Sequence, residues 1–240
     1  MKLFMPKQHG AWAMVIIPFW LGVVSGGFVW EHIPFFFGWL LLYLATYPML
    51  LLFKKKKLQF HVKWSLIYLV PAILLLLFPL FERPSVAWFG VMMIPFFVIN
   101  AYFSAQNKDR AIMNDFCAIF AFSLAGIASA YLAAGSVTKE AALVFIVSSL
   151  FFIGSTFFVK SMIREKKNAN FKWLSWVFHV INPVLWLIFG QWIVALAFVP
   201  SAFRAIYYYG KGLTPKQIGI YEIINSALFF IMIVTHLVLN

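Results

Sequence analysis

The densest polar run in an otherwise apolar chain is residues 100–115, N-A-Y-F-S-A-Q-N-K-D-R-A-I-M-N-D. Apolar segments of about 20 residues flank it, so we expect the run to lie where two membrane-spanning helices reach water. If one helix continues through it, a single helical face carries Asn100, Ser104, Asn107, Ala111 and Asn114. The alternative is a solvated loop. Because polar groups at membrane depth are costly and often functional, and Asn100 lies inside the apolar span, the run is the first candidate site.

The composition of the whole chain establishes the class of protein. The 240 residues are 64% hydrophobic and 11% charged, whereas a soluble domain carries about 25% charged residues. A chain of this length has room for about nine spanning helices of roughly 20 residues each. No small-residue cleavage site follows the first apolar run, so we expect the first span to be retained. The single cysteine, Cys117, allows no internal disulfide.

Nine apolar segments predict an all-α, multi-pass membrane bundle that forms one domain over residues 1–240. The expected spans are residues 11–29, 33–53, 64–81, 86–105, 115–134, 141–159, 173–189, 192–208 and 218–239. Six prolines lie well inside spans, away from the span ends, and membrane bundles tolerate them because neighbouring helices satisfy the freed backbone groups. These prolines are Pro18, Pro48, Pro71, Pro95, Pro183 and Pro200. Only Gly190 and Gln191 divide the seventh span from the eighth.

The basic residues predict the orientation of the bundle. With the N-terminus in the cytosol and nine spans, the C-terminus lies outside, and all 19 lysines and arginines except Arg83 and Lys139 fall on cytosolic segments. This bias is the one that the positive-inside rule describes. The net charge of +12 follows from the same rule, so it does not indicate nucleic-acid binding. The four lysines of residues 54–57 have two possible roles. They could act as a signal that sets the orientation of the bundle, or they could contact anionic lipid headgroups.

Candidate functional residues gather on the segments assigned to the cytosol. His9 precedes the first span, where a helix N-terminus favours an anion. Lys160, Arg164 and Asn168 recur at helical spacing and would form an anion clamp on one face, although snorkelling explains Lys160 equally well. His179 lies within the seventh span and needs a partner there, as an acid–base group, a ligand or a structural histidine. The candidate binding residues are His9, Asn100, Asn107, Asp109, Arg110, Asn114, Asp115, Lys160, Arg164, Glu165 and His179.

Three stretches resemble the YwiC-like family of bacterial membrane proteins. They are P-K-Q-H-G-A-W-A-M-V-I-I-P-F-W-L-G at residues 6–22, N-K-D-R-A-I-M-N-D at residues 107–115, and V-K-S-M-I-R-E-K-K-N at residues 159–168. The resemblance covers essentially the whole chain, and Gln-His-Gly-Ala-Trp is its most specific part. It implies a multi-pass protein of the bacterial plasma membrane and no particular activity. The layout of nine spans with polar cytosolic loops is similar, more distantly, to UbiA-type prenyltransferases.

The UbiA-type likeness implies a prenyl diphosphate held through Mg²⁺ by two Asp-rich motifs. Neither motif is intact here, so Asp109, Asp115 and Glu165 would hold at most one Mg²⁺. Four cations could instead neutralise a diphosphate without metal: Lys108, Arg110, Lys160 and Arg164.

Two classes of function follow from these observations. The first is an isoprenoid- or lipid-directed transferase, or a non-catalytic relative that keeps a pocket for an anionic or isoprenoid-phosphate lipid. The second is a small transporter, or an accessory or scaffold subunit of a membrane complex. Inverted repeats and broken helices with a mid-membrane charge would favour transport, and the sequence shows neither. The sequence indicates no catalytic residue and no oligomeric state.

Overall fold

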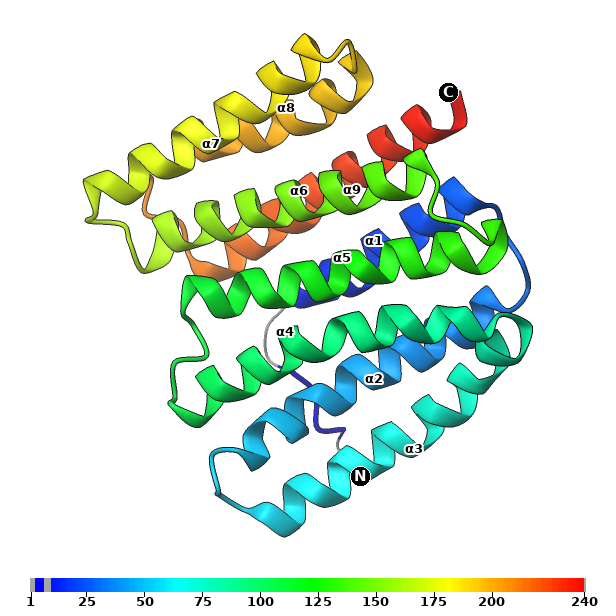
Figure 1. Cartoon of the computed structure of the whole chain (residues 1–240). Helices are drawn as coiled ribbons and strands as arrows, with labels where there is room; N and C mark the ends of the chain where they lie inside the picture. Colours follow the sequence, from blue (N-terminus) through cyan, green and yellow to red (C-terminus); the bar gives the residue numbers. More distant parts are fainter. Residues whose placement is uncertain (1–2, 7–9, 240) are drawn as a thin grey trace. The chain divides into compact units, whose positions relative to one another are not determined.

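The computed structural model describes residues 3–6 and 10–239, and that part of the chain contains helices and turns but no strand. The helices are α1 (Gly10–Gly26), α2 (His32–Leu52), α3 (Leu58–Glu82), the 3-10 helix η1 (Pro84–Val86), α4 (Ala87–Ala105), α5 (Ile112–Ala134), α6 (Lys139–Ile163), α7 (Ala169–Ile188), α8 (Trp192–Tyr207) and α9 (Pro215–Leu239) (Figure 1). The all-α prediction is confirmed, and each α-helix overlaps one predicted span. All six prolines lie inside helices.

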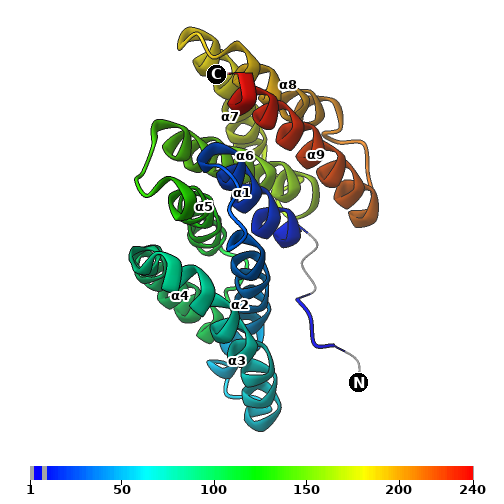
Figure 2. The ribbon, with the colours of Figure 1, turned by 90° about the vertical axis from the view of Figure 1, so that its right-hand side faces the viewer.

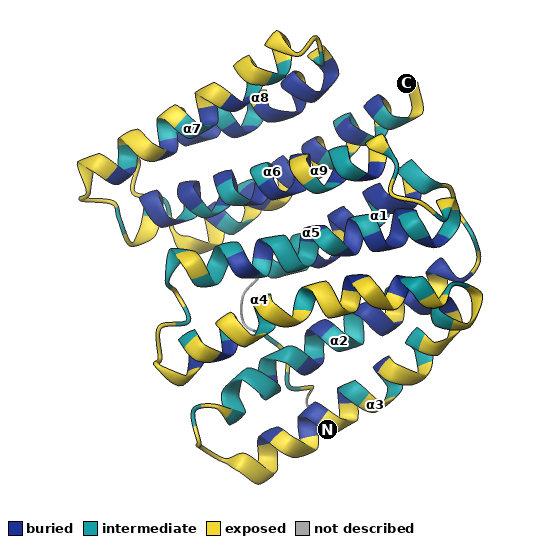
Figure 3. Ribbon diagram, in the orientation of Figure 1, coloured by how far each residue is buried: buried dark blue, intermediate teal, exposed yellow. Residues whose placement is uncertain are grey.

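The lengths and hydropathies of the helices agree with a membrane protein. Seven helices of the described residues are long and apolar enough to cross a membrane, while α1 and α8 are shorter apolar helices. Many large apolar side chains are exposed, among them Trp88 on α4 and Ile188 on α7, and Figure 3 shows such exposed residues along α3, α4 and α7. A soluble protein rarely exposes apolar patches of this extent. The count of nine spans and their orientation stay predictions.

The helices group into two compact units, Met1–Phe145 and Ile146–Asn240, and the boundary falls within α6. We call them unit 1 and unit 2. Unit 1 contains α1 to α5 with the first residues of α6, and unit 2 contains the rest of α6 with α7, α8 and α9. The prediction of a single domain stays a prediction.

Small residues allow α1 and α5 to pack closely in unit 1, and both views show the two helices side by side (Figure 1 and Figure 2). A Cβ on Gly126 would lie 2.7 Å from the carbonyl oxygen of Pro18, and a Cβ on Gly26 would lie 2.7 Å from the Cα of Ala130. Ser129 Oγ also donates to the Phe19 carbonyl (2.7 Å). Small residues four apart on both helices are the usual device for helix association in a membrane, where apolar side chains gain little by leaving lipid.

Of the remaining helices of unit 1, α2 and α4 contact this pair. α2 forms a hairpin with α3, and α4 packs on α5. Trp39 Nε1 donates to the Val15 carbonyl of α1 (3.1 Å). His32, fully buried at the start of α2, makes a 2.8 Å bond through Nε2 to the Ser129 carbonyl of α5. These bonds satisfy polar groups inside the apolar core and fix how α2 sits against α1 and α5.

In unit 2, α7, α8 and α9 form two successive antiparallel hairpins that share α8. α7 packs on α8, and α8 packs on α9. The turn at residues 189–191 between α7 and α8 contains Gly190 in the left-handed region (φ 73°), so the weakly marked division between the seventh and eighth spans is present. Phe151 of α6 stacks on Phe229 of α9 with ring centroids 4.0 Å apart. Trp176 of α7 donates to the Ala205 carbonyl of α8 (3.0 Å).

Basic residues gather at one end of each unit. In unit 1, the lysines of residues 54–57 on the α2–α3 turn lie beside the α4–α5 turn, because Lys54 Nζ is 2.6 Å from Asp109 Oδ2. The turns at the opposite end carry Arg83 and Lys139. In unit 2, the α6–α7 and α8–α9 turns meet where Tyr209 Oη donates to the Lys166 carbonyl (3.3 Å), and the α7–α8 turn carries no basic residue. Within each unit this segregation follows the pattern of the positive-inside rule.

Candidate functional site

The polar run at residues 100–115 does not form one helix, so the alternative of a turn between two spans is the one observed and the conditional single polar face is absent. α4 ends at Ala105 and α5 begins at Ile112. Between them Asn107 adopts a left-handed conformation (φ 56°), and the amides of Asn107 and Lys108 donate to the last carbonyls of α4. Asparagine tolerates this conformation and commonly ends helices. The chain therefore reverses within the run.

This reversal nevertheless brings the two ends of the run together. Asn100 Nδ2 of α4 donates to the Asn114 side chain of α5 (2.9 Å) and to its backbone carbonyl (3.1 Å). Asn114 Nδ2 in turn donates to the Asp109 carbonyl (2.8 Å). Ser104 Oγ donates to the Leu50 carbonyl of α2 (3.0 Å). The polar residues thus join three helix ends, and much of their hydrogen-bonding capacity serves that junction.

The remaining predicted residues of this run lie at the surface of the same end. Asn107 and Arg110 are exposed, and Asp115 is half-buried in the first turn of α5. The Asp109 carboxylate accepts from Lys54. Among the described residues, no three histidine, cysteine, aspartate or glutamate side chains gather closely enough to hold a metal ion. The Mg²⁺ interpretation of Asp109 and Asp115 therefore gains no support from the structure.

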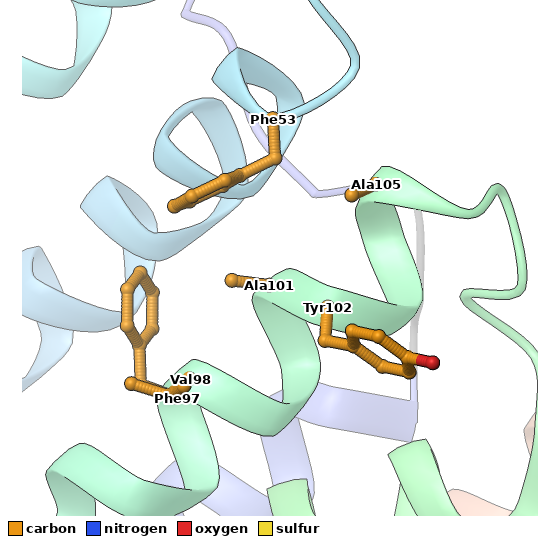
Figure 4. Close-up of a pocket in the computed structure, with 6 residues that line it drawn as sticks. All are labelled: Phe53, Phe97, Val98, Ala101, Tyr102 and Ala105. Carbon is orange, nitrogen blue, oxygen red and sulfur yellow. The ribbon is translucent and has the colours of Figure 1, made fainter.

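A shallow apolar groove of about 290 Å³ lies beside this junction, between the end of α2 and the last turns of α4. In Figure 4 the ring of Phe53 extends toward the ring of Phe97, and the small side chain of Ala101 lies beside them. Its walls are completed by Val98, Tyr102 and Ala105. Phe53 directly precedes the lysines of residues 54–57, so the groove ends at the basic end of unit 1.

In unit 2, Lys160, Arg164 and Asn168 do not lie on one helical face, so that part of the prediction was wrong, and an anion clamp of Lys160 and Arg164 stays a prediction. α6 ends at Ile163, and Asn168 is the N-cap of α7, where its side chain accepts from the Phe171 amide (3.2 Å). Asn168 Nδ2 also donates to Glu165 Oε2 (2.9 Å). Asparagine is favoured at this position because it satisfies an otherwise unpaired helix amide. Lys160 is buried in the last turn of α6, and Arg164 lies exposed in the turn.

A buried cluster in unit 2 contains the residues that sequence reasoning missed. Arg204 of α8 forms an ion pair with Glu222 of α9, and Ser155 of α6 donates to the other carboxylate oxygen of Glu222. The Arg204 guanidinium lies over the Phe158 ring, 4.6 Å from its centroid. The exposed fraction of Arg204 is 3% and that of Glu222 is 9%. A charged pair this well buried in apolar helices marks a functional candidate.

His179 of α7, which the sequence did single out, lies in the same interior. Its Nδ1 is 2.7 Å from the Ser175 carbonyl, so Nδ1 carries the proton and Nε2 of the neutral ring is an acceptor. Nε2 has no hydrogen-bond partner in the described part of the chain. It lies against Gly154 of α6, where an added Cβ would be 3.2 Å away. Each of the four helices of unit 2 therefore contributes one polar side chain to this cluster.

One signal in the sequence could have revealed the pair. Arg204 lies inside the predicted span 192–208, and Glu222 lies inside the predicted span 218–239. Counting Arg204 with the cytosolic charges concealed that it lies within a predicted span and has an acidic partner on the next one.

Two predictions about this region stay predictions. His9 lies outside the described residues. The convergence of His9, residues 107–110 and residues 160–164 around one cavity involves both units as well as His9.

Comparisons with known proteins agree with the resemblance seen in the sequence. Residues 5–130 match the family model described as "YwiC-like protein". The chain is 45% identical to "Uncharacterized protein YwiC" of Bacillus subtilis over 229 residues, 95% of this chain and 96% of that protein. It is 40% identical to an "Uncharacterized protein" of Haemophilus influenzae over 233 residues, 97% of this chain and 98% of that protein. No solved structure matches the chain, so the layout likeness to UbiA-type enzymes stays a prediction. The chain belongs to the YwiC-like family.

Proposed function

We propose that this protein binds an anionic lipid, of the isoprenoid-phosphate class, at the basic end of unit 1 in the bacterial plasma membrane. The observation that carries the proposal is the apolar groove that ends at the lysines of residues 54–57. A lipid tail in the groove would place its headgroup phosphate at these lysines. In this proposal the basic ends of both units face the cytosol.

The groove suits a hydrocarbon chain. Its lining is apolar apart from the hydroxyl of Tyr102, which points away from Phe53 and Phe97 in Figure 4. Ala101 and Ala105 leave room where larger side chains would fill the space. Bulk lipid tails compete for such a groove, because leaving lipid for protein gives an apolar chain little driving force in a membrane. Selectivity must therefore come mainly from the headgroup.

The lysine turn supplies the charge that a phosphate requires. Lys55, Lys56 and Lys57 are exposed, and Lys55 and Lys57 both hold left-handed backbone conformations (φ 55° and 49°). Such conformations are unfavourable for residues other than glycine and are often kept at functional positions. Each lysine near an anionic headgroup is worth about 1 kcal/mol.

The headgroup part of the proposal is tested with the full-length protein purified in detergent. Binding of farnesyl phosphate, farnesol and dioleoylphosphatidylglycerol is followed by native mass spectrometry. We expect farnesyl phosphate to bind more tightly than the other two. The double variant K55Q/K57Q should weaken farnesyl phosphate binding by roughly 30-fold, which is about 1 kcal/mol for each lysine. The control K139Q removes a basic residue at the opposite end of unit 1 and should change binding little.

The tail part of the proposal is tested in the groove itself. Val98→Trp fills the groove and should weaken binding of farnesyl phosphate, whereas Val91→Trp, on the same helical face two turns away, should not. Both valines are exposed, so neither change disturbs the core. Equal binding of farnesol and farnesyl phosphate would refute the function. Equal binding of phosphatidylglycerol would refute the isoprenoid class and leave a general anionic-lipid site.

A further inference from the structure

We propose that the interior of unit 2 binds an oxyanion, a carboxylate or phosphate group, on the guanidinium of Arg204. This site lies in a different unit from the lipid groove, and the inference does not depend on the function proposed above. It rests on the hydrogen-bonding geometry of Arg204, on the neighbouring His179, and on the charge balance with Glu222.

The Arg204 guanidinium presents an intact fork of two donors. Glu222 pairs with Nη1, while Nε and Nη2 have no hydrogen-bond partner in the described part of the chain. The N–H groups of Nε and Nη2 point the same way and match the two oxygens of a carboxylate or phosphate. The Phe158 ring supports the flat face of the guanidinium. Buried donors left without acceptors are costly, and an oxyanion would satisfy both.

His179 adds a second group suited to such an occupant. Its exposed fraction is 3%, its Nε2 is an unpartnered acceptor, and its ring interacts electrostatically with Arg204. The hydroxyl of a hydrogen phosphate group would donate to Nε2, whereas a carboxylate would use the Arg204 donors alone. The lack of a side chain at Gly154 lets the His179 ring pack close to α6, because an added Cβ there would lie 3.2 Å from Nε2. The cluster thus offers two donors and one acceptor, which complement two oxygens and the hydroxyl of a hydrogen phosphate group.

Between α8 and α9, the polar side chains near the basic end give way to aromatic side chains farther along the helices. Beside the Arg204–Glu222 pair, Asn225 Nδ2 donates to Ser201 Oγ (2.9 Å), and this bond is the next polar contact between α9 and α8. One turn farther, Phe198 contacts Phe229, with ring centroids 5.7 Å apart. Phe229 in turn stacks on Phe151. An oxyanion that enters from the basic end would therefore meet an apolar barrier of phenylalanine rings beyond the hydrogen bond between Asn225 and Ser201.

The charge balance predicts how Glu222 affects binding. Arg204 and Glu222 together are neutral, so an added anion leaves one uncompensated negative charge in a medium where charges are costly. Replacing Glu222 by glutamine keeps the shape and removes the opposing charge. The affinity for an oxyanion should therefore rise in E222Q. If the space around the Arg204 fork admitted no anion, E222Q would leave Arg204 uncompensated without creating any anion dependence.

The experiment measures thermal unfolding of the detergent-purified full-length protein by tryptophan fluorescence. Sodium phosphate and sodium acetate are compared with sodium chloride at matched ionic strength, and farnesyl phosphate is tested separately. Ligand that binds only the folded state raises the unfolding temperature with concentration. We expect at least tenfold tighter phosphate binding in E222Q than in the natural protein. E140Q makes the same charge change at an exposed position and should leave phosphate binding unchanged.

The fork is tested separately from the charge. R204K/E222Q has the same charge as E222Q but lacks the paired donors, so it should lose the gain in affinity. R204K alone keeps the ion pair, gives the same test if E222Q does not fold, and should lose the stabilisation by phosphate. Stabilisation by farnesyl phosphate that requires Arg204, without any by inorganic phosphate, would identify a lipid-borne oxyanion. Equal binding by E222Q and E140Q, or by E222Q and R204K/E222Q, would overturn the proposal.

Discussion

Substitution of Gly22 by alanine should destabilise the protein much more than a single methyl group would suggest. Gly22 lies where α1 approaches α5 most closely. A Cβ at this position would overlap the Gly126 carbonyl oxygen and Ser129 Oγ, and would lie 2.8 Å from the Gly126 carbonyl carbon. Ordinary contacts begin at 3.4 Å. Because the obstacle is backbone, α1 must move away from α5.

The size of the effect follows from what this movement breaks. Overpacking of a well-packed interface costs about 1–3 kcal/mol. The hydrogen bond from Ser129 Oγ to the Phe19 carbonyl (2.7 Å) would also be lost, at about 0.6 kcal/mol for a bond between membrane helices. We therefore expect a loss of about 2–4 kcal/mol. For a chain of this length, that loss lowers the unfolding temperature by about 4–16 °C.

The assay is thermal unfolding in detergent, with Gly90→Ala as the matched control. Gly90 is also within a helix, but no atom lies within 4 Å of its added Cβ. The change at Gly90 should be neutral or stabilise by up to about 1 kcal/mol, since alanine is the better helix former. If the two variants unfolded within 1 °C of each other (roughly a quarter to a half of a kcal/mol for a chain of this size), the close α1–α5 contact would be refuted.

Two further predictions concern the buried ion pair and the topology. Arg204→Met should cost about 3–5 kcal/mol because it leaves Glu222 buried and unpaired, whereas R204M/E222M should recover most of that loss in the same unfolding assay; equal losses in the two variants would show that the charges are not coupled. An alkaline phosphatase reporter fused after the last residue should be active, and one inserted at residues 54–57 or beside Lys166 should be inactive. An inactive C-terminal fusion would contradict nine spans.

The helices of this protein were predictable from the sequence because a spanning helix is set by local hydropathy. The expected second span, residues 33–53, became α2 (His32–Leu52), and the expected ninth span, residues 218–239, became α9 (Pro215–Leu239). The prediction of a basic end needed only the positions of lysine and arginine along the chain. These properties depend on runs of neighbouring residues, which the sequence displays directly.

Helical spacing failed where it was extended past the end of a helix. Asn100 and Asn114 do meet, but across a reversal at Asn107 rather than along one face. Lys160 and Asn168 were assigned to one face, yet Asn168 caps the following helix. In the sequence, a few polar residues that end one helix and begin the next have the same spacing as the polar face of one continuous helix.

Only the tertiary structure decided which polar residues become partners. Lys54 pairs with Asp109 although 55 positions separate them, and the buried cluster of Arg204, Glu222 and Ser155 draws on three different helices. Such partnerships depend on which helix faces pack together and how closely. In the α1–α5 contact, that closeness depends on glycines at 22 and 126. The sequence by itself determined where the chain crosses apolar surroundings, whereas helix packing determined which charges meet inside them, because a buried charge is stabilised by its neighbours in space.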